Sequence, residues 1–259
     1  MIRQRLGKDL LFFDGGMGTL LQEKGLAPGE LPETWNLTHS EEIYKIHRQY
    51  IEAGSDIILT NTFGANALKF HDDSCSLEEI IKAAVSHVKK AEREALLQTG
   101  DERKIYTALD VGPTGKLLKP MGDLEFETAY EAFKEVVILG EQAGADLIHI
   151  ETMSDTYELK AAVLAAKENT SLPVFATVIF DERKKLLTGA DVSSVVALLE
   201  GLGVDALGIN CAMGPKEMLP VLEELIKYSS VPIIVKPNAG LPKQRDGKTY
   251  YDVTEDEFA

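Results

Sequence analysis

The chain alternates short apolar runs of strand length with longer stretches in which apolar residues recur every three to four positions. Seven short runs predict buried parallel strands over residues 10–14, 56–60, 105–110, 146–151, 174–179, 205–210 and 231–236. The stretches between them predict helices over 41–53 behind a Ser40 cap, 77–97, 125–143, 156–168, 192–202 and 216–227. This order of elements predicts βαβ units and a parallel sheet.

Three segments of the chain repeat a short pattern in which a helix ends at glycine and an aspartate opens the next strand. The glycine–aspartate pairs lie at 54 and 56, 144 and 146, and 203 and 205. In each pair the glycine is expected to form the C-terminal cap. Eight such units close a (β/α)8 TIM barrel of about 250 residues. We count seven strands, and residues 253–259 are typical of the start of another helix with Thr254 as its cap.

The predicted fold is therefore α/β: a (β/α)8 TIM barrel that stops after its seventh strand, with residues 1–259 as one domain. A doubly wound open sheet is the alternative. Hydrophobic residues make up 44% of the chain, which is enough for a sizeable core, and the net charge of -15 argues against binding nucleic acid or an anionic membrane. Two distant cysteines and the lack of a long apolar run favour a cytoplasmic protein that binds small molecules.

The predicted strands end in polar or glycine-containing segments, where a TIM barrel builds its active site. These segments cover 14–19, 60–64, 110–114, 151–152, 210–211 and 236–240. Strand alternation places Asp14 on one face with Leu10 and Phe12. It also places Glu151 on the inward face, with His149 one layer deeper as a satisfied interior histidine. The two carboxylates could bind an ammonium group, act as an acid and a base, or cap nearby backbone amides.

Other strand-end residues leave their chemistry open. Gly15 and Gly16 could expose N–H groups to a carboxylate-sized anion or form a tight turn without a ligand, and their spacing fits neither the Rossmann nor the Walker pattern. Lys236 could be a Schiff-base lysine or a structural lysine that extends toward solvent. Cys211 could be a ligand or a small buried apolar residue.

Taken together, the strand-end motifs resemble the homocysteine-binding S-methyltransferase barrel, most closely the N-terminal domain of cobalamin-dependent methionine synthases. The matching segments are 14–19, 61–64, 112–114, 151–152, 208–215 and 236–242, in order over nearly the whole chain. The resemblance implies zinc-dependent methyl transfer to the homocysteine thiol, giving methionine. It implies methylcobalamin as the donor, recharged from 5-methyltetrahydrofolate, with the cobalamin-binding and folate-binding domains on a longer parent chain.

The same resemblance assigns roles to individual residues. The substrate-binding residues would be Asp14, Gly15, Gly16, Thr62 and Glu151, with the two carboxylates on the α-amino group and amides near the others on the carboxylate. Cys211 would be the catalytic thiolate ligand of zinc, and Asn238 a displaceable ligand. Zinc serves this chemistry because a bound thiol is deprotonated, whereas a free thiol with a pKa of about 8.5 is mostly protonated at neutral pH.

The family's two remaining zinc ligands are an adjacent Cys-Cys pair, which is absent from this sequence. We therefore expect the last βα unit to be missing and this fragment to be inactive alone. Two alternatives stay open: a stand-alone homocysteine methyltransferase that uses betaine or S-methylmethionine, and a non-catalytic barrel that binds an amino acid.

Overall fold

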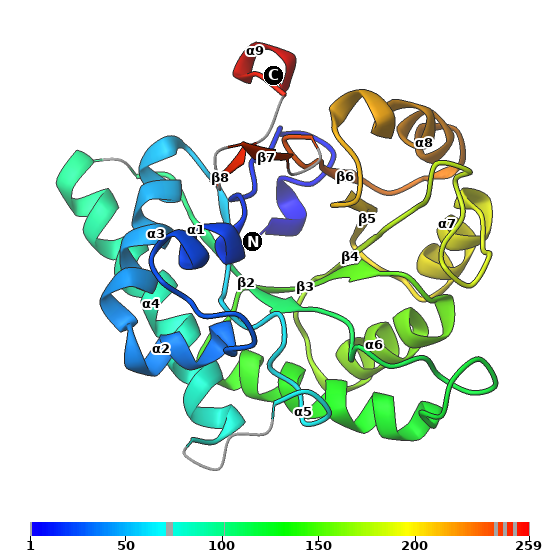
Figure 1. Ribbon diagram of the computed structural model, residues 1–259, viewed down its shortest axis with the longest axis horizontal. Helices are drawn as coiled ribbons and strands as arrows, with labels where there is room; N and C mark the ends of the chain where they lie inside the picture. The colour runs from blue at the N-terminus through cyan, green and yellow to red at the C-terminus, as the bar shows by residue number, and fades with distance from the viewer. Residues whose placement is uncertain are drawn as a thin grey trace.

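The computed structural model describes residues 2–70, 75–100, 102–240, 243–245, 248–250 and 253–258, so Leu241, Pro242 and Ala259 of the sequence motifs lie outside it. Its centre is a curved sheet of six parallel strands (Figure 1), namely β1 Ile57–Leu59, β2 Tyr106–Val111, β3 Leu147–Met153, β4 Val174–Val178, β5 Ala206–Asn210 and β6 Ile233–Lys236. Each strand pairs with the next one in the chain. This order confirms the TIM-barrel-like α/β prediction, because a doubly wound sheet would reverse its strand order partway.

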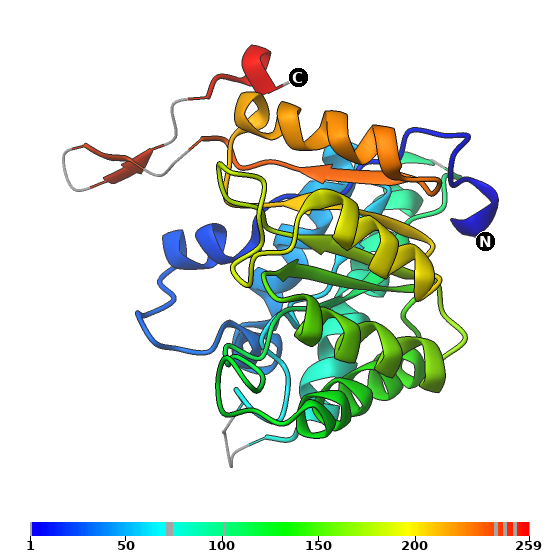
Figure 2. The same cartoon turned by 90° about the vertical axis from the view of Figure 1, so that its right-hand side faces the viewer.

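Helices α3 to α8 pack along the outside of the sheet, whereas the short α1 lies beyond the carboxyl ends of the strands (Figures 1 and 2). The helices are α1 Met17–Glu23, α2 Trp35–Thr38, α3 Ser40–Ala53, α4 Leu77–Thr99, α5 Phe126–Ala143, α6 Thr156–Asn169, α7 Val192–Gly201 and α8 Pro215–Tyr228. The short elements are the 3-10 turns η1 Ile2–Gln4 and η2 Pro32–Thr34, the hairpin strands β7 Lys243–Arg245 and β8 Lys248–Tyr250, and α9 Glu255–Phe258. Within these described elements, no helix is both long and apolar enough to cross a membrane.

The helix ends follow local capping chemistry. Thr254 caps α9 by accepting the Glu257 N–H, as predicted, and Ser76, which was not predicted as a cap, caps α4 in a reciprocal capping box with Glu79. Gly54 and Gly144 are left-handed C-caps, also as predicted, whereas the C-cap of α7 is Leu202 and the left-handed Gly203 follows one residue later. The prediction of a Ser40 cap is wrong: Ser40 is the first residue of α3, and the N-cap is the preceding residue, whose side chain makes no capping bond.

The first predicted strand, 10–14, is wrong as a regular strand. It is reduced to a single parallel bridge between Phe13 and Ile57 at the free edge of β1. Leu10 is 78% exposed and Phe12 is 56% exposed, so the predicted inward face of this segment points to solvent. Phe13 instead packs toward the sheet interior. An edge segment held by one bridge does not have to keep the alternation of a paired strand.

The repeated aspartates explain why the strand starts align. Asp56, Asp146 and Asp205 each donate their N–H to the carbonyl of a residue in the preceding strand segment and accept that residue's N–H on the carboxylate, at 2.9 to 3.0 Å. The three partners are Phe12, Thr107 and Val174. Each carboxylate also pairs with a cation, respectively Arg5, Lys89 and Arg3. The repeat is therefore a device that fixes parallel register at the amino ends of the strands.

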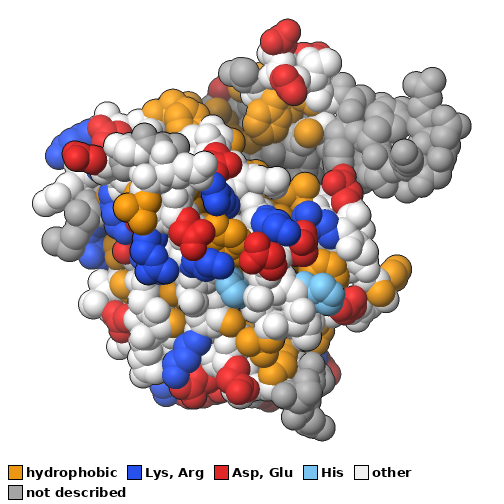
Figure 3. Space-filling model, turned by 90° about the vertical axis from the view of Figure 1, so that its left-hand side faces the viewer, with side chains coloured by type: hydrophobic (Ala, Val, Ile, Leu, Met, Phe, Trp, Pro, Cys, Tyr) orange, Lys and Arg blue, Asp and Glu red, His pale blue; other side chains and the backbone are white. Residues whose placement is uncertain are grey.

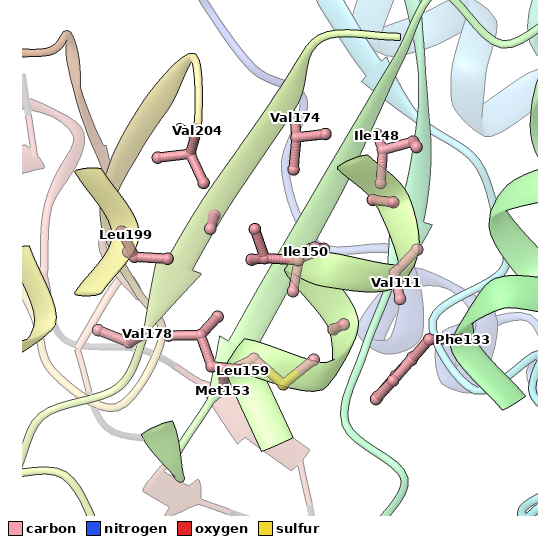
Figure 4. Packing of buried hydrophobic residues seen from close by; sticks show 14 of the residues in the cluster. Val111, Phe133, Ile148, Ile150, Met153, Leu159, Val174, Val178, Leu199 and Val204 are labelled. Carbon is pink, nitrogen blue, oxygen red and sulfur yellow. The ribbon is translucent and has the colours of Figure 1, made fainter. Parts of the chain in front are cut away.

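Two apolar clusters lie on opposite faces of the sheet. The outer cluster joins the strands to α5, α6, α7 and α8. Figure 4 shows part of it, with Ile148, Ile150 and Val174 on the strands and Leu159 and Leu199 on the helices that cover them. The inner cluster lines the concave face with Ile2, Ile57, Leu59, Tyr106, Ala108, Leu147, Phe175, Ala206 and Ile234. Because residues from both β1 and β6 share the inner cluster, the sheet must curl like a barrel wall.

We expect Asp146→Ala to lower the free energy of unfolding by about 1–2 kcal/mol, because it removes the acceptor of the Thr107 N–H and the partner of Lys89. Urea denaturation measures this change. Asp123→Ala is the matched control, since Asp123 is exposed and opens no strand. Equal stability of the two variants would contradict the role assigned to the repeat.

Candidate functional site

Four titratable side chains meet at the carboxyl ends of the strands. They are Asp14 at the end of the edge segment 10–14, Asp110 on β2, Glu151 on β3 and Lys236 at the end of β6. Lys236 Nζ donates to Glu151 Oε2 at 2.8 Å, and the ammonium lies 5.1 Å from the centre of the Phe13 ring. Two strands separate β3 from β6 in the sheet, so this contact spans the concave face. The curl of the sheet thus creates the site.

Asp14 is buried beside this ion pair. Its Oδ2 accepts the Leu59 N–H at 2.9 Å, whereas its buried Oδ1 has no hydrogen-bond partner within the described ranges. Burial raises the pKa of Asp14 to about 7, and the nearby charge of Glu151 adds to the rise, although Lys236 and the Leu59 amide oppose it. The prediction that Asp14 reaches the barrel mouth is supported by this position, even though its segment is not a regular strand.

The pKa values of Asp110 and Glu151 are shifted in opposite directions, although the two groups share the same surroundings. Burial raises the pKa of Asp110 well above its ordinary value, and the negative charge of Glu151 raises it further. Burial also opposes ionisation of Glu151, but the ammonium of Lys236 and the adjacent His149 ring outweigh it and lower the pKa of Glu151 to about 2. Glu151 is therefore the ionised partner of Lys236, and Asp110 holds its proton more tightly.

His149 lies one layer below Glu151, as strand alternation predicted. Its ring is fully buried, 4.9 Å from the Phe13 ring, and Nε2 lies 3.4 Å from Glu151 Oε2. Burial lowers the pKa of His149, so the ring is uncharged at neutral pH. The interior position agrees with the prediction, but the expectation that this histidine is satisfied is wrong, because both ring nitrogens are buried without a hydrogen-bond partner among the described residues.

The glycine turn after Asp14 is exposed and anchored by a tyrosine. The Tyr50 hydroxyl donates to the Gly16 carbonyl at 3.1 Å, and a Cβ on Gly15 would lie 2.8 Å from that hydroxyl. Thr62 is arranged differently: its N–H donates to Thr60 O at 2.9 Å and its hydroxyl donates to Asp110 O at 2.8 Å. The donors of Thr62 are thus engaged inside the protein, whereas the glycine turn faces solvent.

Asn210 joins the ends of β3 and β5. Its Oδ1 accepts the Thr152 N–H at 3.0 Å, and its Nδ2 donates to Thr152 Oγ1 at 2.7 Å and to Cys211 Sγ at 3.3 Å. Thr152, Cys211 and Ala212 have φ values of 63°, 55° and 58°. Side-chain-bearing residues rarely adopt this left-handed conformation, and such strain gathers at functional sites. Asn210 therefore fixes the thiol next to the Glu151 segment.

The residues present do not complete a zinc site by themselves. Cys211 is half-buried, and burial raises the pKa of its thiol, with Glu151 adding to the rise. Asn238 is held close to the segment that follows Cys211, because its N–H donates to Met213 O at 3.0 Å. Across the described part of the chain, no three His, Cys, Asp or Glu residues are grouped so that they could hold a metal ion. A catalytic zinc site needs three protein ligands.

Sequence reasoning did not assign roles to Tyr50, Asn210 or Asp110, although the last two belong to its strand-end segments. For Asp110 the signal was present, since it follows Tyr106 and Ala108 at alternate positions on the inner face. Tyr50 lies in the last turn of α3, and only the packing of that helix against the glycine turn brings it to the site.

A barrel-like α/β wall with buried acidic groups at the carboxyl ends of its strands is typical of a TIM-barrel enzyme. The model of the family "Homocysteine S-methyltransferase" matches residues 11–259, so the chain belongs to that family. Methionine synthase of Mycobacterium leprae (strain TN) is 33% identical over 99% of this chain, and that of Mycobacterium tuberculosis (strain ATCC 25618 / H37Rv) is 34% identical over 98%. The chain spans 22% of the length of each of these relatives.

Solved structures agree on the fold. The metallated form of the homocysteine methyltransferase MmuM from Escherichia coli has a TM-score of 0.81 at 24% identity, covering 90% of this chain and 85% of that one. The apo form has a TM-score of 0.76 at 25% identity, covering 90% and 83%. On the face shown in Figure 3, basic and acidic side chains lie next to one another. The ion pairs of the α3 region include Lys24–Glu42 and Arg48–Glu52.

We expect Asp14→Asn to gain stability relative to the unmodified protein as the pH rises from about 4 to about 7. An unfolded aspartate ionises near pH 3.9, whereas burial raises the pKa of Asp14 to about 7 in the folded protein. Between these values the unfolded chain binds fewer protons, so rising pH favours unfolding of the unmodified protein. Urea unfolding at about pH 5 and about pH 8 measures the difference; a pH-independent difference would contradict the raised pKa.

Proposed function

We propose that the chain binds homocysteine as the methyl acceptor of a methionine-forming methyltransferase. The observation that carries the proposal is the buried acidic site next to a positioned thiol, in a chain of the homocysteine S-methyltransferase family. An amino acid presents an ammonium group, which the carboxylates of Asp14 and Glu151 can bind. The exposed N–H groups of Gly15 and Gly16 are suited to its carboxylate. The amide of Thr62 would have to exchange its bond to Thr60 to take part.

The substrate's sulfur would lie on the Cys211 side of the site. Asn210 sets the spacing between this side and the carboxylates, because it bonds both Thr152, which follows Glu151, and Cys211. A fixed spacing between an ammonium site and a sulfur site suits a substrate that carries both groups on one short chain. Holding the acceptor in one orientation reduces the entropic cost of methyl transfer.

The proposal extends to a longer polypeptide. In it, Cys211 and Asn238 would bind zinc together with a Cys-Cys pair on a further βα unit. Methylcobalamin and 5-methyltetrahydrofolate would be bound by other domains. The small share of each methionine synthase relative that this chain covers, and the metallated form of MmuM, support this extension. The exposed Leu10, Phe12 and Val235 at the two edges of the sheet are surfaces that one more unit could cover.

A second candidate is a non-catalytic amino-acid-binding barrel. It is favoured by the incomplete metal ligand set of the described residues. A betaine- or S-methylmethionine-dependent methyltransferase is the alternative within the family. Methyl-donor dependence of the parent polypeptide separates these functions: turnover with betaine and without a corrinoid would favour the alternative enzyme, and no turnover with any donor would favour the binding barrel.

We expect Glu151→Gln to weaken L-homocysteine binding by about tenfold or more, because hydrogen bonds to a charged group contribute about 1.5–3 kcal/mol. Isothermal titration of the chain measures this loss. Glu94→Gln is the control, since Glu94 accepts the Tyr44 hydroxyl on the outside of the barrel. Unchanged affinity in Glu151→Gln would remove this residue from the substrate site.

We expect the 259-residue chain to retain little zinc, because one thiolate and one carboxamide cannot form the sulfur-rich shell that gives zinc sites their affinity. The measurement is metal analysis after equilibration with zinc and dialysis against a chelator. One zinc ion retained per chain would contradict the prediction. In that case, loss of the metal in Cys211→Ser but not in Cys75→Ser would identify the ligand.

A further inference from the structure

The mouth of the barrel holds one carboxyl group more than the proposed pair of Asp14 and Glu151. Asp110 is 6% exposed and Asp14 is 7% exposed. The Oδ1 atoms of both residues are buried and have no hydrogen-bond partner among the residues that the structure describes. Tyr106 and Ala108, at alternate positions before Asp110, belong to the inner cluster. The Asp110 carboxyl therefore points into the concave side, where Asp14 and Glu151 also lie.

The ammonium of Lys236, which lies next to these carboxyl groups, already forms an ion pair with Glu151. Lys236 donates to Glu151 Oε2 at 2.8 Å, and its charge also acts on Asp14 and Asp110. One ammonium therefore serves three carboxyl groups. Buried carboxylates without partners cost several kcal/mol each unless a cation or donors reach them. Two unpartnered oxygens beside one engaged lysine thus define a site that lacks a positively charged donor.

We propose that Asp110 is a third acidic residue of the substrate site, which binds the α-ammonium of the amino acid together with Asp14 and Glu151. The inference rests on the proposed function and deepens it. A primary ammonium has three N–H donors, one for each carboxyl group. Lys236 then holds Glu151 in place from the other side and offsets one of the negative charges. Such a site selects a primary ammonium over an uncharged or fully substituted nitrogen, which has fewer donors to offer.

The experiment compares L-homocysteine with 4-sulfanylbutanoate, which has the same thiol and carboxylate but no amino group. Binding is read from thermal unfolding at rising ligand concentration, because this method also registers weak ligands. Asp110→Asn keeps the shape of the side chain and removes its ability to ionise. Asp56→Asn is the matched control, since it makes the same change at a buried aspartate at the opposite ends of the strands.

We expect Asp110→Asn to weaken L-homocysteine binding by about tenfold or more and to change 4-sulfanylbutanoate binding by less than about twofold. Asp56→Asn should leave the affinity for both ligands unchanged. Without ligand, Asp110→Asn should unfold at the same temperature as the unmodified protein or higher, because it removes a buried carboxyl group without a partner.

Three results would overturn the proposal. They are unchanged homocysteine affinity in Asp110→Asn, an equal loss for both ligands, and a variant that fails to fold, since the last two indicate a structural role for Asp110. Failure of the proposed function gives a different result: the unmodified protein would then show no preference for homocysteine over 4-sulfanylbutanoate, and the role of Asp110 would fall with it.

Discussion

The ion pair between Lys236 and Glu151 is the constraint on which the functional end of this protein depends. Its two residues lie on strands that are separated by two others, so their contact at 2.8 Å requires a strongly curled sheet. The same curl brings Asp14 and Asp110 beside the pair and places His149 beneath it. Out of water each charge changes the proton affinity of its neighbours, so Glu151, whose pKa is lowered, coexists with Asp14 and Asp110, whose pKa values are raised.

The two ends of the strands use acidic residues in different ways. At the amino ends, Asp56, Asp146 and Asp205 each bind the preceding strand segment and a cation, which satisfies their charge. At the carboxyl ends, the Oδ1 atoms of Asp14 and Asp110 have no hydrogen-bond partner in the part of the chain that the structure describes, and Thr152 and Cys211 have strained backbones. This division is typical of barrel enzymes, in which one end contributes stability and the other holds the active site. The stability gained from the paired aspartates at the amino ends offsets the free-energy cost of the unpartnered oxygens and strained backbone at the carboxyl ends.

The alternation of side chains along a strand correctly predicted which residues face the site on β3, which has a neighbour on both sides. The same rule gave the wrong inward face for the edge segment 10–14. Glu151 and His149 share the inner face of β3, because a strand between two neighbours cannot shift by one residue without exposing its apolar side. The segment 10–14 is held by a single bridge, so its pairing does not fix which side chains face inward, and Phe13 turns inward instead of Phe12. Asp14 is buried all the same, because its carboxylate binds the Leu59 amide. Strand alternation and the family motif both pointed to Asp14, although the same alternation wrongly placed Leu10 and Phe12 on the inward face.

The sequence by itself determined the order of strands and helices, most of the helix caps, the repeated aspartates and the polar residues at the strand ends. These features depend on neighbours within a few positions, which the chain carries wherever it folds. Only the tertiary structure decided that Lys236 pairs with Glu151, that Asn210 binds Thr152 as well as its neighbour Cys211, and that Asp110 Oδ1 is buried with no hydrogen-bond partner among the described residues. The first two contacts join residues 85 and 58 positions apart in sequence, and the curl of the sheet brings them together because its apolar inner face must be buried.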